Sequence, residues 1–304
     1  MGGPLPSVAV VIPTRGRPQL LERCVRAVLA DEATSEVVVV IDGDDPPSAR
    51  AMAAVAADDC RVRVANLDPK ADPRSRAQTA RQLGARMARS DVLLSLDDDV
   101  VVGPGLVTGH ARRHADDDGL VVVGYMPVRR RAPGEEREPG TVRLYREGYE
   151  RACRRYRDDP ESILRGLWAG NVSVRRAHWL AVPELPPGEA TAHIDRRFGR
   201  QLAEAGLRGV FDPGLLAEHW YERSPHHFLV GAGEMAVDDA RQGENTGRAH
   251  RLAPLGRLVR PAPVWRVVAS VAIATAELAW KLRLDSVERA ILRLASRLAY
   301  ERAR

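Results

Sequence analysis

The sequence contains little lysine, little cysteine and few aromatic residues. Of its 46 Lys and Arg residues only Lys70 and Lys281 are lysines, and the net charge of +5 is small. We attribute this bias to genome composition, typical of a bacterial protein, so the charge by itself does not predict nucleic-acid binding. Cys24, Cys60 and Cys153 are odd in number and far apart, and no pair has the spacing of a metal or redox motif. We therefore expect a reducing compartment.

Long hydrophobic runs are also missing. Residues 1–6 do not combine a charged start with an apolar stretch, so we expect no secretory signal. The longest nearly uncharged stretch, residues 267–276, is too short to span a bilayer and is followed by Glu277. These features predict a cytoplasmic protein, and 304 residues are enough for one large domain or two smaller ones.

Short apolar strands alternate with helical patterns over the first hundred residues. Runs at 8–12, 37–41, 62–65 and 92–96 predict buried strands. Apolar residues at helical spacing predict helices between these strands. This alternation is typical of a parallel, doubly wound α/β sheet, in which ligands bind beyond the carboxyl ends of the strands.

The second half of the chain is expected to add strands and helices of the same kind. We expect strands at 120–125, 167–174 and 208–211, and helices at 142–157 and from Asp195 to near Gly206. His226 and His227 are expected in an exposed loop.

Three consecutive acids, Asp97, Asp98 and Asp99, follow the strand at 92–96. Side chains alternate along a strand, so we expect Asp97 and Asp99 to share one face and Asp98 to point to the other. Two carboxylates so close together are costly to keep charged without a cation, and a hard divalent ion that carries phosphates is the natural partner. The alternative is an acidic turn in water.

Six segments, in order, resemble a family 2 glycosyltransferase of the GT-A fold. They are residues 10–18 (VVIPTRGRP), 38–43 (VVVIDG), 80–84 (ARQLG, with Gln82 where the family has Asn), 97–99 (the D-x-D motif), 170–175 (GNVSVR) and 195–202 (DRRFGRQL). The resemblance implies a Rossmann-like nucleotide-sugar-binding domain with a mixed, mainly parallel sheet. It also implies inverting transfer of a sugar from a nucleotide diphosphate donor, most often a UDP-sugar, with Mn²⁺ or Mg²⁺.

The resemblance also implies roles for individual residues. Asp99 would bind the metal with Asp97 and His219, and Asp42 would accept a hydrogen bond from uracil. The remaining residues expected to contact the donor are Pro13, Thr14, Arg15, Arg17, Asp44, Arg81, Asp97 and Asp98. The alternative for Arg81 is that it only pairs with a nearby acid. On the acceptor side the residues are Trp168, Gly170 and Asn171, where Trp168 either stacks on a sugar or packs in the core.

Asp195 is the expected general base, because a carboxylate at a helix N-terminus facing a cleft can take the proton of an acceptor hydroxyl. The family's Glu before this base is Ile194 here, so Glu189 is kept as an alternative base. Asp195 could instead only stabilise the helix dipole. Because Ile194 replaces this Glu, a second interpretation is a non-catalytic protein that binds nucleotide sugars. A sugar nucleotidyltransferase is the other alternative, although residues 14–18 lack its glycine-rich phosphate loop.

The C-terminal segment differs from the rest. We expect a GT-A domain over 1–250, with a nucleotide-binding half at 1–102 and an acceptor half at 103–250, and a helical extension over 251–304. One helical stripe contains Val264, Val267, Val268, Val271, Leu278 and Leu282, and a second contains Val287, Ile291, Leu294 and Leu298. A capping box is expected at 285–288.

These stripes would pack on the domain or on a second copy of the chain, or lie on a membrane surface. Packing is the commoner outcome for such stripes, and membrane contact would favour a lipid-linked acceptor over a small molecule or a peptide. No sequence motif supports a nucleic-acid partner. The biological setting we expect is natural-product or cell-envelope glycosylation.

Overall fold

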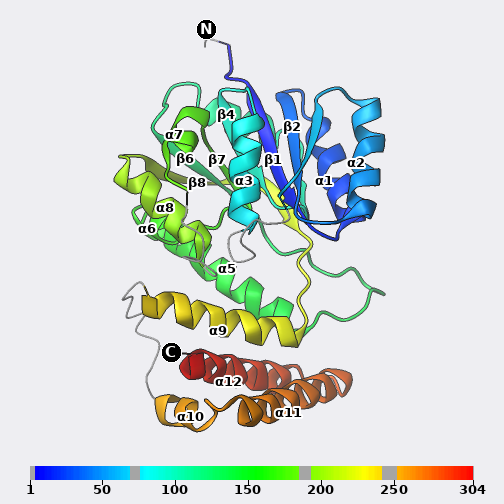
Figure 1. The fold of residues 1–304 in the computed structure, drawn as a ribbon, viewed down its shortest axis with the longest axis vertical. Coiled ribbons are helices and arrows are strands. Elements are labelled where there is room, and N and C mark those ends of the chain that lie inside the picture. Colours follow the sequence, from blue (N-terminus) through cyan, green and yellow to red (C-terminus); the bar gives the residue numbers. More distant parts are fainter. Residues whose placement is uncertain (1–3, 69–75, 185–192, 242–251, 304) are drawn as a thin grey trace. The chain divides into compact units, whose positions relative to one another are not determined.

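The computed structural model describes residues 4–68, 76–184, 193–241 and 252–303. The chain forms two compact units (Figure 1). The first contains Met1–Arg129, Glu150–Glu189 and Ile194–Trp220, and the second contains Arg130–Tyr149, Ala190–His193 and Tyr221–Arg304. The second unit therefore includes segments that precede residue 250. The expected boundary at residue 250, between a domain and a helical extension, remains a prediction.

A mixed, mainly parallel sheet organises the first unit, as the sequence predicts. Its strands are β1 (Val8–Thr14), β2 (Thr34–Ile41), β3 (Val62–Asn66), β4 (Val92–Leu96), β5 (Val100–Val102), β6 (Leu120–Tyr125), β7 (Asn171–Arg175) and β8 (Arg208–His219), in the order β3-β2-β1-β4-β7-β6-β8-β5. Strands β1 to β4 are parallel to one another. β7 is antiparallel to both β4 and β6, and β5 is antiparallel to β8.

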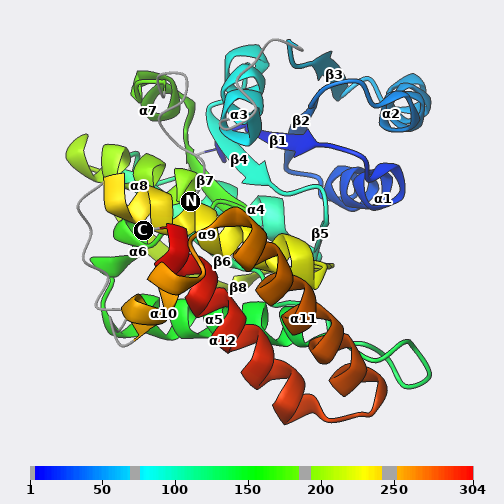
Figure 2. The same ribbon diagram turned by 60° about the horizontal axis from the view of Figure 1, so that its bottom comes forward.

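Helices cover the sheet. They are α1 (Pro18–Leu29), α2 (Pro46–Asp58), α3 (Arg76–Met87), α4 (Leu106–Arg113), α6 (Ser162–Arg165), α7 (Arg176–Ala181) and α8 (Ile194–Glu204), and α5 (Gly140–Asp158) belongs partly to each unit. α3 packs on β1 and β2, and Figure 2 shows α1 on the opposite side of these strands. The valine-rich strands β1, β2 and β4 are almost fully buried, which explains their continuous apolar sequences.

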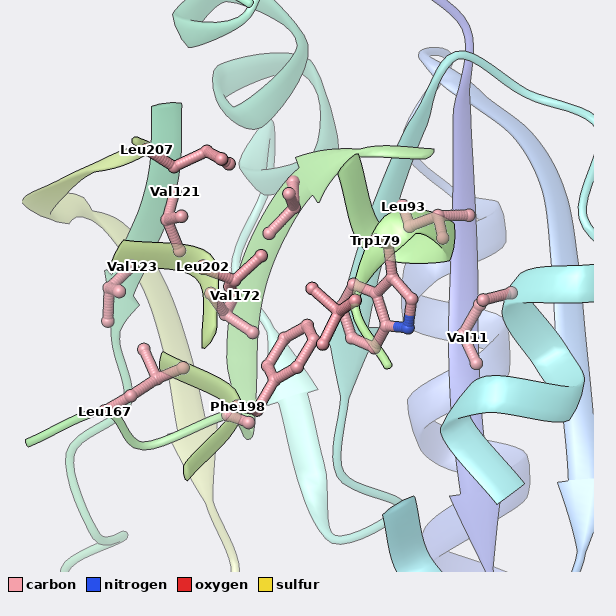
Figure 3. Close-up of a cluster of buried hydrophobic side chains, with 14 of the residues drawn as sticks. Val11, Leu93, Val121, Val123, Leu167, Val172, Trp179, Phe198, Leu202 and Leu207 are labelled. Carbon is pink, nitrogen blue, oxygen red and sulfur yellow. The ribbon is translucent and has the colours of Figure 1, made fainter. Parts of the chain in front are cut away.

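One hydrophobic core joins the parallel strands β1, β2 and β4 of the first unit to β6, β7 and helix α8 (Figure 3). Trp179 and Phe198 lie at its centre with ring centroids 4.6 Å apart. The indole N–H of Trp179 donates to Gln82 Oε1 at 2.6 Å, so the residue that departs from the family motif satisfies a buried donor. This packing ties α3, α7 and α8 together and sets where the first turn of α8 lies.

The described residues of the second unit also form the helices α9 (Pro225–Arg241), α10 (Ala253–Leu258), α11 (Ala262–Lys281) and α12 (Asp285–Ala303). α12 packs against α9, α10 and α11. His226 and His227 are exposed as expected, but they lie in the first turn of α9 and not in a loop, so that expectation is wrong. Pro225 opens this helix, where its missing N–H costs nothing.

The expected capping box at the start of α12 is also not formed. The Glu288 carboxylate accepts a hydrogen bond from the Gly140 backbone N–H at 2.6 Å and pairs with Arg143 at 2.6 Å. Asp285 pairs with the same arginine at 2.8 Å. The N-terminus of α5 is a stronger partner for these acids than the backbone of their own helix, because it offers an orphan donor and a guanidinium together.

Candidate active site

The three acids lie in a turn between β4 and β5. The extended arrangement predicted for them is therefore wrong: Arg17 Nη1 contacts both Asp98 Oδ1 at 2.9 Å and Asp99 Oδ2 at 2.6 Å. Asp97 instead faces Arg81, whose Nη2 is 2.7 Å from Asp97 Oδ1. The turn changes the side-chain directions because strand alternation ends with the last strand residue, Leu96.

The loop after β1 is attached to these acids. The Thr14 hydroxyl donates to Asp98 Oδ2 at 2.7 Å, and the Arg15 backbone N–H donates to the same oxygen at 3.4 Å. Pro13 precedes them as a half-buried residue of β1. The sequence motif at 13–17 thus forms a loop that approaches the acids through hydroxyl, amide and guanidinium groups, as a donor-binding loop would require.

Asp45 is a residue of this region that sequence reasoning missed. Its carboxylate accepts hydrogen bonds from the Gly16 N–H at 2.6 Å and from the Ser48 N–H at 3.2 Å, so it joins the loop after β1 to the start of α2. Burial opposes its charge, but the hydrogen bonds from Ser48 and Gly16 lower the pKa of Asp45 below its ordinary value. The available signal was an Asp directly before Pro46-Pro47, which is a typical N-cap position.

Asp42 and Asp44 follow β2. The Asp42 N–H donates to the Thr14 carbonyl at 2.8 Å. Its carboxylate contacts Arg76 at the start of α3 and lies 3.7 Å from Arg15 Nη1. Asp44 is exposed on the same loop. Asp42 is therefore close to the loop after β1, as the sequence predicts, and is neutralised by arginine.

Burial of the acids gives the site unusual electrostatics. Burial raises the pKa of Asp97 and of Asp98 above the ordinary range, although Arg81 and Arg17 respectively oppose the shift. Burial also acts on Asp99, but the contacts with His219 and Arg17 lower the pKa of that carboxyl. Buried carboxylates of this kind are stabilised by cations, and here arginines provide the positive charge.

His219 lies beside Asp99. His219 Nε2 is 3.2 Å from Asp99 Oδ1, and both residues are buried. The pairing of β5 with β8 brings them together, because Val100 is opposite His219 in the register. The following residue, Trp220, donates its backbone N–H to the Asp99 carbonyl at 2.8 Å.

The fit of this site to a divalent metal can be judged from its donors. Over the described ranges, no three or more His, Cys, Asp or Glu side chains are close enough to form a complete protein metal site. A carboxylate oxygen and an imidazole nitrogen are nevertheless suitable ligands for Mn²⁺, and a site with two protein ligands leaves positions for phosphate oxygens and water. Asp99 and His219 therefore fit such an ion, whereas Asp97 is engaged by Arg81.

Arg81 connects Asp97 of the acidic turn with Asp195 of α8. Its side chain is only 7% exposed, and its Nη1 lies 3.4 Å from Asp195 Oδ1 while Nη2 contacts Asp97. Its Nε donates to Ser95 Oγ at 3.1 Å. Burial opposes its charge, but Asp195 and Asp97 raise the pKa of Arg81, so the guanidinium remains charged. The sequence predicted contact with the nucleotide or pairing with an acid, and the structure shows pairing with two acids.

Asp195 lies in the first turn of α8, as the sequence predicts. Its Oδ2 accepts a hydrogen bond from the Ala169 N–H at 3.0 Å, and its side chain is 34% exposed. The carboxylate is thus held from two sides yet remains accessible. The alternative base, Glu189, lies outside the described residues.

The predicted acceptor-side residues differ in what they contact. A Cβ at Gly170 would lie 2.6 Å from Asp97 Oδ2, so this glycine permits the close approach of Asp97. Asn171 is buried, and its amide N–H donates to the Leu215 carbonyl at 3.1 Å. Trp168 is half-buried and packs against the core, which favours the packing alternative over sugar stacking.

A buried histidine network behind Asn171 was not predicted. His110 Nε2 is 3.0 Å from Asn171 Oδ1 and its Nδ1 is 2.8 Å from Ser173 Oγ, which in turn is 2.8 Å from His114 Nε2. Burial lowers the pKa of His110 to about 3 and that of His114 to about 4. Both imidazole rings are therefore neutral. Each of the three contacts can then be a hydrogen bond with one donor and one acceptor. Two histidines four apart on a helix were the available signal.

Trp220 is held on both faces by arginine. The guanidinium carbons of Arg23 and Arg129 lie 4.0 Å and 4.1 Å from the centre of its ring. Its indole N–H donates to Glu218 Oε2 at 2.9 Å. Cation–π contacts on both faces fix the residue that follows His219, and sequence reasoning did not detect this role.

Comparisons with known proteins agree with this arrangement. The family model "Glycosyl transferase family 2" matches residues 9–176. The mannosyltransferase PcManGT from Pyrobaculum calidifontis, in complex with GDP-Man and Mn²⁺, is 14% identical with a TM-score of 0.58, over 97% of this chain and 87% of that one. No curated protein matches the sequence.

Two longer proteins share the fold over part of their length. GalNAc-T7, in a structure with UDP, GalNAc and Mn²⁺, is 15% identical with a TM-score of 0.53, over 72% of this chain and 44% of that one. TarS from S. aureus is 15% identical with a TM-score of 0.52, over 76% of this chain and 39% of that one. The three structures support the GT-A fold, and the family model, which covers more than half of the sequence, shows that this chain belongs to glycosyl transferase family 2.

Proposed function

We propose that the protein transfers a sugar from a nucleotide diphosphate sugar to an acceptor hydroxyl, with inversion and with the help of Mn²⁺ or Mg²⁺. A UDP-sugar is the favoured donor. The observation that carries the proposal is the bridge made by Arg81, because one buried guanidinium contacts both Asp97 beside the D-x-D turn and Asp195 at the start of α8. Donor-side and acceptor-side acids therefore belong to one site.

The residues of the first unit have distinct roles in donor binding. Asp42 would accept a hydrogen bond from the base, and the loop of Thr14, Arg15 and Arg17 would line the phosphates. Asp99 and His219 would hold the divalent ion, which neutralises charge on the diphosphate leaving group when it is bound. The guanidinium of Arg17, 46% exposed, can supply further positive charge to the same phosphates.

Asp195 would act as the general base. The Ala169 N–H and Arg81 orient its carboxylate, and its exposed part leaves an oxygen for the acceptor hydroxyl. The proton moves from that hydroxyl to the carboxylate as the oxygen attacks the anomeric carbon, so direct displacement inverts the configuration. Such a base contributes about 10²–10⁴-fold in rate.

A donor panel tests the proposal. The structure of PcManGT holds GDP-Man and that of GalNAc-T7 holds UDP, so UDP- and GDP-sugars are each compared by thermal shift with and without Mn²⁺. We expect a Mn²⁺-dependent rise in melting temperature for one donor, with the UDP-sugars favoured. If no nucleotide sugar shifts the melting temperature, the proposal is wrong. Release of pyrophosphate instead of a nucleoside diphosphate would indicate a nucleotidyltransferase.

The variant Asp195→Asn separates the base from a structural acid. We expect its turnover to fall by about 10²–10⁴-fold while donor binding is retained, since the amide keeps the shape but cannot take the proton. Glu204→Gln, in the exposed last turn of the same helix, is the matched control and should keep wild-type turnover. Equal turnover of Asp195→Asn and the wild type would exclude Asp195 as the base.

A further inference from the structure

The outer face of α11 is apolar and exposed. Its exposed members are Val264, Val267, Val271 and Leu278, with relative exposures from 41% to 64%. Their spacing of three, four and seven residues places them along one side of the helix. Leu258 at the end of α10 and Leu284 after α11 are exposed as well, at 69% and 48%. We call these four residues of α11 the outer stripe.

The opposite side of α11 makes the packing contacts. Its buried residues are Ala276 and Ala279, and the helix packs against α12 within the second unit (Figure 2). Within the described part of the single chain, packing therefore covers one side of this helix and leaves the outer stripe exposed. A helix of a water-exposed bundle normally places charged residues opposite its packed side, and an exposed apolar face of this length marks an interaction surface.

The charge around the outer stripe indicates its partner. Residues 252–303 contain nine Lys and Arg residues against four Asp and Glu, an excess equal to the net charge of the whole chain. Arg257 and Arg260 precede the stripe, and Lys281 and Arg283 follow it. An anionic lipid surface complements this pattern, because basic residues meet headgroups while the stripe enters the acyl boundary. A second copy of the chain would bring like charges together.

The same helix is long and apolar enough to cross a membrane, judged by length and composition alone. The nearly uncharged stretch at residues 267–276 is the middle of this helix. Arg266 and Glu277 lie within the helix, however, and one side of it packs on α12, so an orientation parallel to the surface suits it better. Trp265 and Trp280 are stacked by Arg302 and Arg137 within the unit and are not part of the stripe.

We propose that α11 binds the surface of an anionic bilayer through its outer stripe, with the basic residues at its two ends contacting lipid headgroups. The proposal is independent of the catalytic roles given above. It goes beyond sugar transfer because it places the protein at a lipid surface.

Vesicle co-sedimentation of the full chain tests the proposal. We expect binding to vesicles of phosphatidylcholine with phosphatidylglycerol, little binding to phosphatidylcholine alone, and weaker binding at high salt. The double variant Val267→Glu/Val271→Glu should lose binding by more than about tenfold, since it places two carboxylates on the contact face. Val230→Glu is the matched control, because Val230 is an exposed valine on α9, also in the second unit.

Thermal unfolding of each variant identifies any that fails to fold. If the double variant unfolds early, Val267→Ser replaces it, with the same expected direction. Equal binding of wild type and folded variant would overturn the proposal, as would no binding to anionic vesicles. A dimer seen by analytical ultracentrifugation and abolished by the same substitutions, without vesicle binding, would assign the stripe to a second copy and also overturn it.

Discussion

In the proposed metal site, Arg17 and the ion would share the Asp99 carboxylate, and the effect of Arg17 on metal binding can be measured. Its Nη1 lies 2.6 Å from Asp99 Oδ2 and 2.9 Å from Asp98 Oδ1. His219 contacts Asp99 Oδ1, so a dication held by Asp99 and His219 would lie on the same carboxylate as this guanidinium, and the two positive charges would repel each other. We therefore predict that Arg17→Met, which removes the charge and keeps much of the length, strengthens Mn²⁺ binding to the nucleotide-free protein.

The size of the effect follows from the exposure of Arg17. A hydrogen bond to a charged group contributes about 1.5–3 kcal/mol. The Arg17 side chain is 46% exposed, so water screens its contacts and the lower end of the range applies. A change of about 1.4 kcal/mol corresponds to about tenfold in the dissociation constant of Mn²⁺. With UDP present we expect Arg17→Met to bind Mn²⁺ more weakly than the wild type, because the variant has lost a positive charge that would contact the diphosphate.

The assay is a Mn²⁺ titration followed by the paramagnetic resonance of the free ion. The charge of Arg17 opposes the burial that raises the pKa of Asp98, and it helps to lower the pKa of Asp99. Removing the Arg17 charge therefore raises the pKa of both Asp98 and Asp99. The titration is made near pH 8 so that protons do not compete with Mn²⁺ for these carboxylates. Arg26→Met is the control, since Arg26 pairs with exposed Glu22 on α1. Unchanged or weaker Mn²⁺ binding in Arg17→Met, without nucleotide, would refute the reasoning.

Two further predictions concern stability and are measured by urea unfolding. A Cβ at Gly199 would lie 2.1 Å from the Leu164 carbonyl oxygen, so Gly199→Ala should destabilise the protein by about 1–3 kcal/mol. A Cβ at Gly148 would meet open space, so Gly148→Ala in helix α5 should stabilise the protein by up to about 1 kcal/mol. Equal effects would contradict this packing. In the folded protein the pKa is about 3 for His110 and about 4 for His114, against 6.5 for an ordinary histidine. Below pH 6.5 the unfolded chain therefore binds more protons than the folded one. Stability should be full above pH 6.5 and fall on acidification, by about 2 kcal/mol per histidine at pH 5, and a flat profile would exclude neutral burial.

Sequence reasoning worked where the signal is local. The apolar runs and their alternation with helices predicted the parallel strands, and the sequence segments at 13–17 and 97–99 both lie at carboxyl ends of strands. The position of Asp195 in the first turn of α8 was also predicted. These features depend on residues close together in the chain, so period and turn chemistry are sufficient to find them.

The errors have physical causes that act over longer distances. The directions of Asp97, Asp98 and Asp99 were predicted from strand alternation, which fails in a turn. The sequence also left open which surface would cover the apolar stripe of α11, because this helix is apolar on two sides and periodicity alone does not tell which side is covered within the chain.

The sequence by itself determined the family, the parallel half of the sheet and which residue types surround the candidate site. Only the tertiary structure decided their partners. Asp99 meets His219 because β5 and β8 pair in one register, and Arg81 meets Asp195 because α3 and α8 share one core. More than a hundred residues separate the members of each pair, so their contact depends on the packing of the whole first unit and on no local pattern.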